Sequence, residues 1–204
     1  MGRRHHGHKF MPGKFVFPGG RLERSDGNIR SCSELQPVVA ERLAARCVRR
    51  SELRGRALAL TAIRETYEET GLLVGRPGPE GHLTQPGHPA WRPFLDSGIV
   101  PDLGPISFIG RAITPPRRPK RFDTRFFCVD RTAVSAEHDG FVGPDKELIE
   151  LAWVDLKAAQ KLDLPRITSI MLEELEHRLA ASDPEGGPVP FYRESRGRFL
   201  RETL

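Results

Sequence analysis

Three glutamates lie close together in the stretch AIRETYEETGL, which spans residues 62–72. Glu65, Glu68 and Glu69 are spaced so that they project from one face of an α-helix, with neighbouring Cβ atoms roughly 5 to 6 Å apart. Like charges placed in this way repel one another, and hard divalent cations such as Mg²⁺ use carboxylate oxygens as ligands. The spacing therefore predicts a metal site, whereas an isolated pair of glutamates more often marks a solvated acidic helix end.

Glycines on either side of the glutamates favour a ligand site over a solvated helix end. Gly71 follows the glutamates, at the point where a helix end requires a residue that tolerates positive φ. Upstream, the sequence FPGGRLE at residues 17–23 predicts a tight turn, in which Gly19 and Gly20 free backbone carbonyls and amides to approach a ligand.

Together these residues resemble the signature of the Nudix hydrolases, G-x(5)-E-x(7)-R-E-U-x-E-E-x-G-U, in which U is a bulky apolar residue. The second half, from Arg64 to Leu72, matches this Nudix box except that Thr66 occupies a U position. In the first half, Gly20 is followed after five residues by Asp26, which keeps the carboxylate but shortens it.

The spacing between the two halves departs from the signature. Residues 27–63 separate Asp26 from Arg64 where the signature has seven residues, so residues 27–56 are interpreted as an insertion of about thirty residues. Nudix enzymes that act on coenzyme A and related diphosphates carry a long insertion inside the box, preceded by FPGG, and the resemblance to them is looser than the resemblance to the box itself.

A helix is predicted within the insertion, over residues 33–50. Ser33 and Gln36 have the spacing of a capping box, and apolar residues recur at helical spacing. These apolar residues are Leu35, Val39, Leu43 and Cys47. Such a helix could cover the substrate, pack on the domain or form the interface of a homodimer.

The resemblance implies a metal cofactor, Mg²⁺ or Mn²⁺, and assigns its ligands. Glu68 and Glu69 would bind the metal, and Glu65 would bind metal or orient the attacking water. The backbone of Gly19 or Gly20 would supply a further ligand and approach the substrate, with Gly20 the preferred metal ligand.

The resemblance also implies two further catalytic positions. Arg64 would pair with the box carboxylates and hold the loop against the helix, unless it forms only a weak surface pair. In this family the general base often comes from outside the box, and Asp145, Glu147 and Glu150 precede or begin a predicted strand. Glu147 is the preferred candidate, while surface charge before a strand explains these acids equally well.

A basic segment between two predicted strands offers candidate phosphate contacts. Arg118 and Arg121 lie there with Arg117 and Lys120. They could grip a second phosphate of the substrate or keep a Pro-rich loop solvated, and both interpretations stay open.

Composition predicts one soluble catalytic domain at residues 1–182, followed by a basic tail at 183–204. The chain has 204 residues, 38% of them hydrophobic, enough for one sizeable core. No apolar run approaches the roughly eighteen residues that span a bilayer, and the N-terminus lacks the apolar core of a signal peptide. The formal charge of +5 comes from scattered arginine clusters without a recognition motif, which disfavours nucleic-acid binding.

Three cysteines, an odd number, argue against both a disulfide framework and a zinc cluster. Cys32, Cys47 and Cys128 show no C-x-x-C spacing. A reducing cytosol is therefore the expected location.

The order of predicted elements fits an α+β Nudix fold, a mixed β-sheet sandwiched between α-helices. Pro and Gly are frequent over residues 75–105, which predicts a long connection. The predicted strands are 14–17, 106–113, 125–129 and 148–154, and the predicted helices are 56–70, 155–162 and 168–181.

The first eighteen residues are too few for the two strands that precede the glycine turn in this fold, since one ordinary strand uses about five or six residues. Residues 1–12 are rich in charge and contain glycine and proline, so they are not expected to supply a buried strand. We therefore expect a sheet with a gap beside residues 14–17, in a chain that is incomplete or is completed by a partner.

The predicted function is metal-dependent hydrolysis of a diphosphate linkage in a nucleotide-derived small molecule. The alternative is a non-catalytic Nudix-like module that binds nucleotides or has a regulatory role. Such modules commonly lose box glutamates, whereas all three are present here. Coenzyme A, ADP-ribose, dinucleotides and nucleoside triphosphates all remain candidate substrates.

Overall fold

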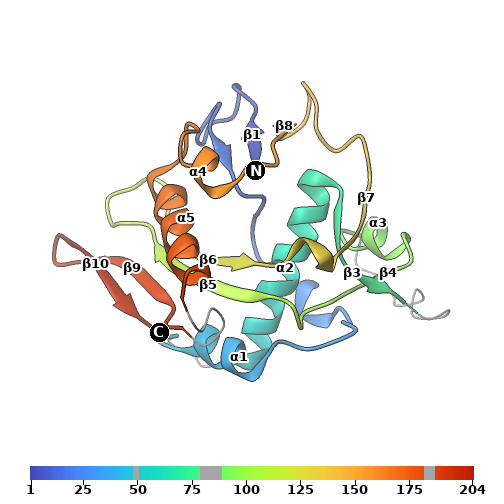
Figure 1. The fold of residues 1–204 in the computed structure, drawn as a ribbon, viewed down its shortest axis with the longest axis horizontal. Helices are drawn as coiled ribbons and strands as arrows, with labels where there is room; N and C mark the ends of the chain where they lie inside the picture. Colours follow the sequence, from blue (N-terminus) through green and yellow to red (C-terminus); the bar gives the residue numbers. More distant parts are fainter. Residues whose placement is uncertain (48–50, 79–88, 182–186) are drawn as a thin grey trace.

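The computed structural model describes residues 1–47, 51–78, 89–181 and 187–204 (Figure 1). Its largest sheet is mixed and has the strand order β10-β9-β5-β6. Strand β5 pairs antiparallel with β6 and parallel with β9, while β9 and β10 form an antiparallel hairpin. The strands are Ser107–Ile113 (β5), Asp123–Cys128 (β6), Pro190–Ser195 (β9) and Arg198–Thr203 (β10).

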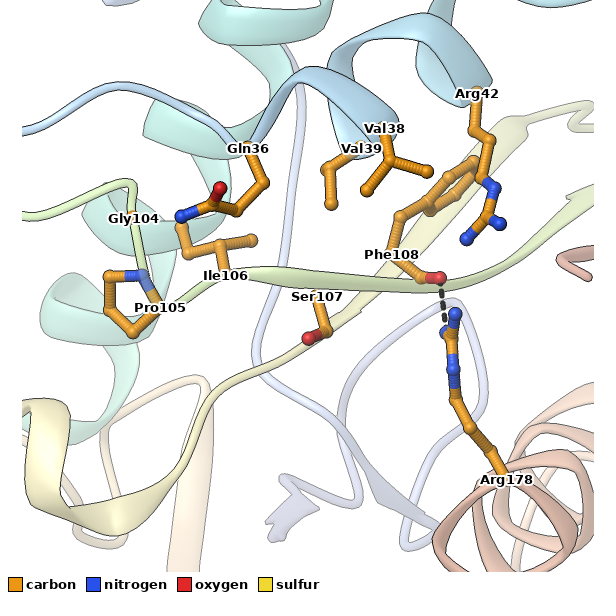
Figure 2. A pocket seen from close by; sticks show the side chains of 10 residues that line it. All are labelled: Gln36, Val38, Val39, Arg42, Gly104, Pro105, Ile106, Ser107, Phe108 and Arg178. Atoms are coloured by element: carbon orange, nitrogen blue, oxygen red, sulfur yellow. Dashed lines mark hydrogen bonds between the residues drawn. The ribbon is translucent and has the colours of Figure 1, made fainter. Parts of the chain in front are cut away.

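Helices pack on both faces of this sheet, as expected for the predicted α+β sandwich. On one face Met171 of α5 packs against Ala112, and on the other Val39 of α1 clusters with Phe108. Figure 2 shows α1 on one side of β5 and Arg178 of α5 on the other, where Nη1 of Arg178 donates to the carbonyl of Phe108 at 2.5 Å. The helices are Pro37–Ala44 (α1) and Arg166–Leu179 (α5).

The longest helix, α2, spans Glu52–Thr70 and carries the second half of the box. It begins four residues before the predicted start because Ser51 caps it, with a side chain that accepts from the amide of Arg54. It ends at Gly71, whose φ of 76° is the left-handed conformation predicted for that glycine. The buried side of α2 carries Ala59, Leu60, Ile63 and Tyr67.

A second sheet contains the start of the chain. Strand β1, Gly2–Arg4, lies between β2, Phe15–Val16, and β8, Leu148–Leu151, and pairs antiparallel with both. The expected gap beside residues 14–17 is therefore wrong, because residues 2–4 fill it. The charge of this segment disfavours a central strand, but its arginines pair with glutamates of the neighbouring chain segment, Arg3 with Glu150 and Arg4 with Glu147.

A third sheet has the order β4-β3-β7 and occupies part of the predicted long connection. The predicted long connection over residues 75–105 is wrong for the part of it that the structure describes. Apolar side chains of this segment enter the core, although the segment is rich in proline and glycine. Trp91 and Phe94 are fully buried; residues 79–88 lie outside the described residues. The elements are Leu72–Pro77 (β3), Arg92–Leu95 (α3), Ile99–Pro101 (β4) and Val134–Glu137 (β7).

The insertion contains a helix, but a shorter one than predicted. Helix α1 covers 37–44, and its last part ends where Ala45 becomes extended and Arg46 adopts a φ of 50°; residues 48–50 are outside the described residues. The predicted capping box is also wrong. The Ser33 hydroxyl instead bonds the Asp102 carboxylate and accepts from the amide of Gly104 at 2.7 Å, which ties the insertion to the end of β4.

The remaining elements follow the predictions in type and differ in their ends. Helix α4 is capped by Asp155 as expected and spans Leu156–Ala159, and β8 ends three residues before the predicted Val154. The segment expected as a basic tail instead forms the β9–β10 hairpin from residue 190 onwards. In the described residues no helix has the length and apolar character to cross a membrane.

Two adjacent valines test whether the insertion helix packs on the domain. Val39 is 7% exposed and Val38 is 38% exposed. Both lie on α1, so replacement by alanine changes helix propensity similarly and the difference reports packing. We expect Val39→Ala to lower the free energy of unfolding by about 1 to 2.5 kcal/mol and Val38→Ala to change it by less than about 0.5 kcal/mol. Urea denaturation measures both, and equal effects would contradict the packing.

Candidate active site

A buried ion pair joins the two halves of the box. The guanidinium of Arg64 on α2 donates to both carboxylate oxygens of Asp26, with Nε 2.9 Å from Oδ1 and Nη2 3.2 Å from Oδ2. The Arg64 side chain is 2% exposed and the Asp26 side chain 0%. Buried charges require such pairing, because an isolated charge in the interior is costly.

Asp26 accepts further hydrogen bonds from three other parts of the chain. Thr61 Oγ1 lies at 2.7 Å, Trp91 Nε1 at 2.8 Å and the amide of Glu23 at 2.9 Å. Burial alone would raise the pKa of the Asp26 carboxyl, but the hydrogen bonds, led by that of Arg64, outweigh burial and hold the pKa below its usual range. Asp26 is therefore a structural anion that organises the box.

The other edge of the Arg64 guanidinium faces the helix and the glycine turn. Its Nη1 lies 2.9 Å from Glu65 Oε1 and 2.8 Å from Glu68 Oε2, and its Nη2 also donates to the carbonyl of Arg21 at 2.9 Å. Arg64 thus contacts two of the three box glutamates and fastens the turn to α2.

The glycine turn lies directly against two box carboxylates, those of Glu65 and Glu69. The amide of Gly19 donates to Glu69 Oε2 at 3.4 Å. Gly20 lies so close to Glu65 that a side chain at position 20 would collide with the Glu65 carboxylate. This contact explains the glycine at position 20, where the chain needs close approach.

Glu69 lies in surroundings that disfavour its charged form. Burial, together with the nearby charges of Glu147 and Glu65, raises the pKa of Glu69 to about 8 against the smaller opposing effects of the Gly19 amide and Arg4. Burial also raises the pKa of Glu65 and Glu68, although Arg64 opposes the rise in both. Perturbation of this kind marks a candidate functional site.

Glu147 comes to the cluster from the loop before β8. Of the three acids considered as base, it is the one whose charge acts on Glu69. Its Oε1 accepts from Arg4 Nη2 at 2.7 Å, and its carbonyl accepts from the amide of His5 at 3.0 Å. Glu150 is paired with Arg3 instead, and Asp145 is exposed.

The carboxylates fit a divalent cation by their chemistry. Oxygen donors suit Mg²⁺ and Mn²⁺, and in the contacts above the carboxylates outnumber the guanidinium groups of Arg4 and Arg64. Over the described ranges, however, no three His, Cys, Asp or Glu side chains are gathered tightly enough to hold an ion. Two of the box glutamates are turned toward Arg64, so a bound ion would require those side chains to reorient.

The basic loop lies next to the glycine turn rather than among the carboxylates. Its residue Phe122 contacts the guanidinium of Arg21, at 5.7 Å from the ring centre. Arg118 and Arg121 are both exposed, and Nε of Arg121 donates to the carbonyl of Thr114 at 3.2 Å. The structure thus brings Gly19, Gly20 and the glutamates together and leaves Arg118 and Arg121 on the neighbouring loop.

Three residues of the site were not among the sequence candidates. Arg4 contacts Glu147, and Thr61 and Trp91 bond Asp26. Thr61 carried a weak signal, because it lies one helical turn before Arg64 on the same side of α2. Arg4 and Trp91 carried none, since their partners are remote in the sequence.

Two pockets near the insertion are separate from this cluster. One, of about 60 Å³, lies between α1 and β5 and is lined by Gln36, Val39 and Phe108 among others (Figure 2). A second, of about 740 Å³, lies between α1 and the start of α2. Neither is lined by a box carboxylate, so neither supplies the chemistry.

Removal of the buried charge should destabilise the fold. We expect Asp26→Asn to lower the free energy of unfolding at pH 7 by about 3 to 5 kcal/mol, because the buried edge of the Arg64 guanidinium would lose its carboxylate partner. Asp96→Asn is the matched control, since its pair with Arg92 is exposed and 3.9 Å long, and we expect a change below about 1 kcal/mol.

The destabilisation caused by Asp26→Asn should depend on pH. The pKa of Asp26 is lowered on folding, so its contribution is complete above the unfolded value of about 3.9 and is lost as pH falls through the folded value. The difference in unfolding free energy between wild type and Asp26→Asn should therefore shrink below about pH 4. A difference that stays constant in acid would contradict the ionised pair.

Comparison with known proteins supports the fold. The structure is similar to the crystal structure of a NUDIX hydrolase from Alicyclobacillus acidocaldarius, with a TM-score of 0.54 and 29% sequence identity. The alignment covers 84% of this chain and 80% of that chain. No protein-family model and no curated protein matches the sequence. The mixed sheet between helices and this structural neighbour show that the chain has the fold of a Nudix hydrolase.

Proposed function

We propose that this protein is a Nudix hydrolase that cleaves the diphosphate linkage of a nucleotide-derived small molecule and depends on Mg²⁺ or Mn²⁺. One observation carries the proposal: Glu65, Glu69 and Glu147 form one electrostatic cluster beside the glycine turn, and the pKa of Glu69 is raised to about 8. A cluster of unbalanced carboxylates favours a cation, and a diphosphate requires one.

Glu65, Glu68 and Glu69 are the proposed metal ligands, with the backbone of Gly20 as a further donor. When bound, a divalent cation neutralises charge on the phosphate oxygens and lowers the pKa of water. Arg64 organises these ligands, since it holds Glu65 and Glu68 from the buried side and carries the turn through the Arg21 carbonyl. The insertion sits at the other end of α2 and is not part of this proposal.

Glu147 is the proposed general base. Its side chain is 43% exposed, so water reaches it, and Arg4 bonds Oε1. It can accept a proton from the water that attacks phosphorus, at the edge of the cluster where the substrate enters. A carboxylate beside the ligand cluster, rather than within it, keeps an oxygen available for this transfer.

The substrate phosphates are proposed to lie on the backbone of Gly19 and Gly20, with Arg118 and Arg121 on the adjacent loop. Phe122 keeps that loop against Arg21 of the turn, so its cations are near the path of a substrate with more than one phosphate. Exposed arginines at such an entrance raise the local concentration of an anionic substrate.

A non-catalytic binding module is the second candidate. It would use the same glycine turn, but it has no need for the three box glutamates or for a perturbed acid beside them. Turnover therefore separates the two functions.

Charge removal at Glu69 tests the proposed function. A screen of coenzyme A, ADP-ribose, dinucleotides and nucleoside triphosphates with Mg²⁺ or Mn²⁺, followed by release of phosphate or nucleoside monophosphate, should identify a substrate. Loss of groups that only support metal ligands costs about 10 to 100-fold, so we expect Glu69→Gln, which removes a direct ligand, to lower kcat/KM by more than about 100-fold. Folding should survive, because the amide keeps the shape and removes repulsion.

Glu52→Gln is the matched control for this experiment. Glu52 is exposed in the first turn of the same helix, and its replacement should leave activity unchanged. Hydrolysis at the wild-type rate in the presence of a chelator, or in a Glu68→Gln, Glu69→Gln double variant, would contradict the metal assignment. Binding without turnover of every diphosphate would favour the non-catalytic module.

A further inference from the structure

We propose that Arg4, on the first strand of the chain, is a positioning residue that holds the carboxylate of Glu147 beside Glu69. The inference rests on the proposed function for its catalytic meaning, while the contact itself is a property of the fold. It adds to the site a residue from the far N-terminal end of the sequence, outside the box.

The contact is made at both side chain and main chain. Arg4 Nη2 donates to Glu147 Oε1 at 2.7 Å, and the next residue, His5, donates its amide to the carbonyl of Glu147 at 3.0 Å. Arg4 is paired in register with Leu148, the residue after Glu147. Strand β1 therefore fixes the backbone of residue 147 as well as its carboxylate.

The guanidinium of Arg4 is itself held in place. Its side chain is 15% exposed, and the same Nη2 lies 3.2 Å from His8 Nδ1. The main chain of Arg4 is also bonded on both sides. The amide of Gly13 donates to the carbonyl of Arg4 at 3.2 Å, and the amide of Arg4 donates to the carbonyl of Lys14 at 3.0 Å. A largely buried cation on an anchored main chain can orient its partner, whereas two mobile exposed side chains gain little from pairing.

Repulsion gives Glu147 a reason to need this support. It lies within electrostatic reach of Glu69, and the charge of Arg4 offsets part of that effect. Because Glu147 is 43% exposed, an unrestrained carboxylate would turn away from Glu69 into solvent. Arg4 bonds Oε1 only, and in the described part of the chain Oε2 has no hydrogen-bond partner. One oxygen is thus fixed and the other stays open to water.

The neighbouring pair on β1 provides a matched comparison. Arg3 pairs with Glu150 just as Arg4 pairs with Glu147, and both arginines join β1 to the same segment. The guanidinium of Arg3 pairs with Glu150 and lies over the ring of Phe15, 5.8 Å from its centroid, rather than against Glu147. If Arg4 only fastened the strand, loss of either arginine would have the same effect.

Kinetics of single and double variants test the inference in the full-length protein. We expect Arg4→Gln to lower kcat by about 10 to 100-fold, with KM changed by less than about 3-fold, and Arg4→Lys to recover part of the loss. Arg3→Gln should keep kcat within about 3-fold of wild type. In a Glu147→Gln background, Arg4→Gln should cause no further loss, because it acts through Glu147. Equal losses in the two arginine variants, or additive losses in the double variant, would overturn the proposal.

A crystal structure of Arg4→Gln beside that of wild type decides the point independently of turnover. We expect the Glu147 carboxylate to leave the neighbourhood of Glu69 in the variant and to remain there in Arg3→Gln. If the carboxylate stays in place in Arg4→Gln, the positioning role is wrong even when hydrolysis is confirmed. If wild type hydrolyses no diphosphate, the proposed function fails, while the position of Glu147 still shows whether Arg4 holds it.

Discussion

The Arg64–Asp26 ion pair is the interaction on which the rest of the site depends. Arg64 meets Asp26 on one edge and the glutamates and the Arg21 carbonyl on the other. One guanidinium therefore fixes the distance between α2 and the glycine turn. Its planar shape and five N–H donors let it bond partners on two edges at once. Because Thr61 and Trp91 also bond Asp26, the buried charge is fully hydrogen-bonded.

This arrangement divides the acidic residues into two kinds. Asp26 is buried, fully hydrogen-bonded and held ionised, while Glu69 is buried beside other carboxylates and has its pKa raised to about 8. A carboxyl group thus serves as a structural anion at Asp26 and lies uncompensated at Glu69. Environment rather than residue type separates the two roles.

Local signals in the sequence predict the parts of the fold that local chemistry decides. Gly71 ends α2 as a glycine C-cap, Asp155 caps α4, and the β-branched and aromatic residues of β5 and β6 form strands where expected. The site predictions that placed Arg64 against the box and favoured Glu147 also used short-range patterns, and the structure finds these residues in one cluster.

Features decided by remote partners were missed. Residues 2–4 form a central strand because Glu147 and Glu150 neutralise their arginines, and nothing near the N-terminus reports those partners. Trp91 lies in a segment rich in Pro and Gly, yet it is fully buried and bonds Asp26, since tertiary burial outweighs composition. Ser33 has the spacing of a helix cap, but its hydroxyl donates to the Asp102 carboxylate and accepts from the Gly104 amide instead of from a helix amide.

The long insertion within the box shows how little the chemistry depends on spacing along the chain. Loop-closure entropy grows only with the logarithm of length, so extending the connection between Asp26 and Arg64 from seven residues to residues 27–63 costs about 1.5 kcal/mol. Burial of Ile29, Val39 and Leu43 within that connection offsets a cost of this size. The two halves of the box are consequently free to diverge in separation, provided that the carboxylate and the guanidinium still meet in space.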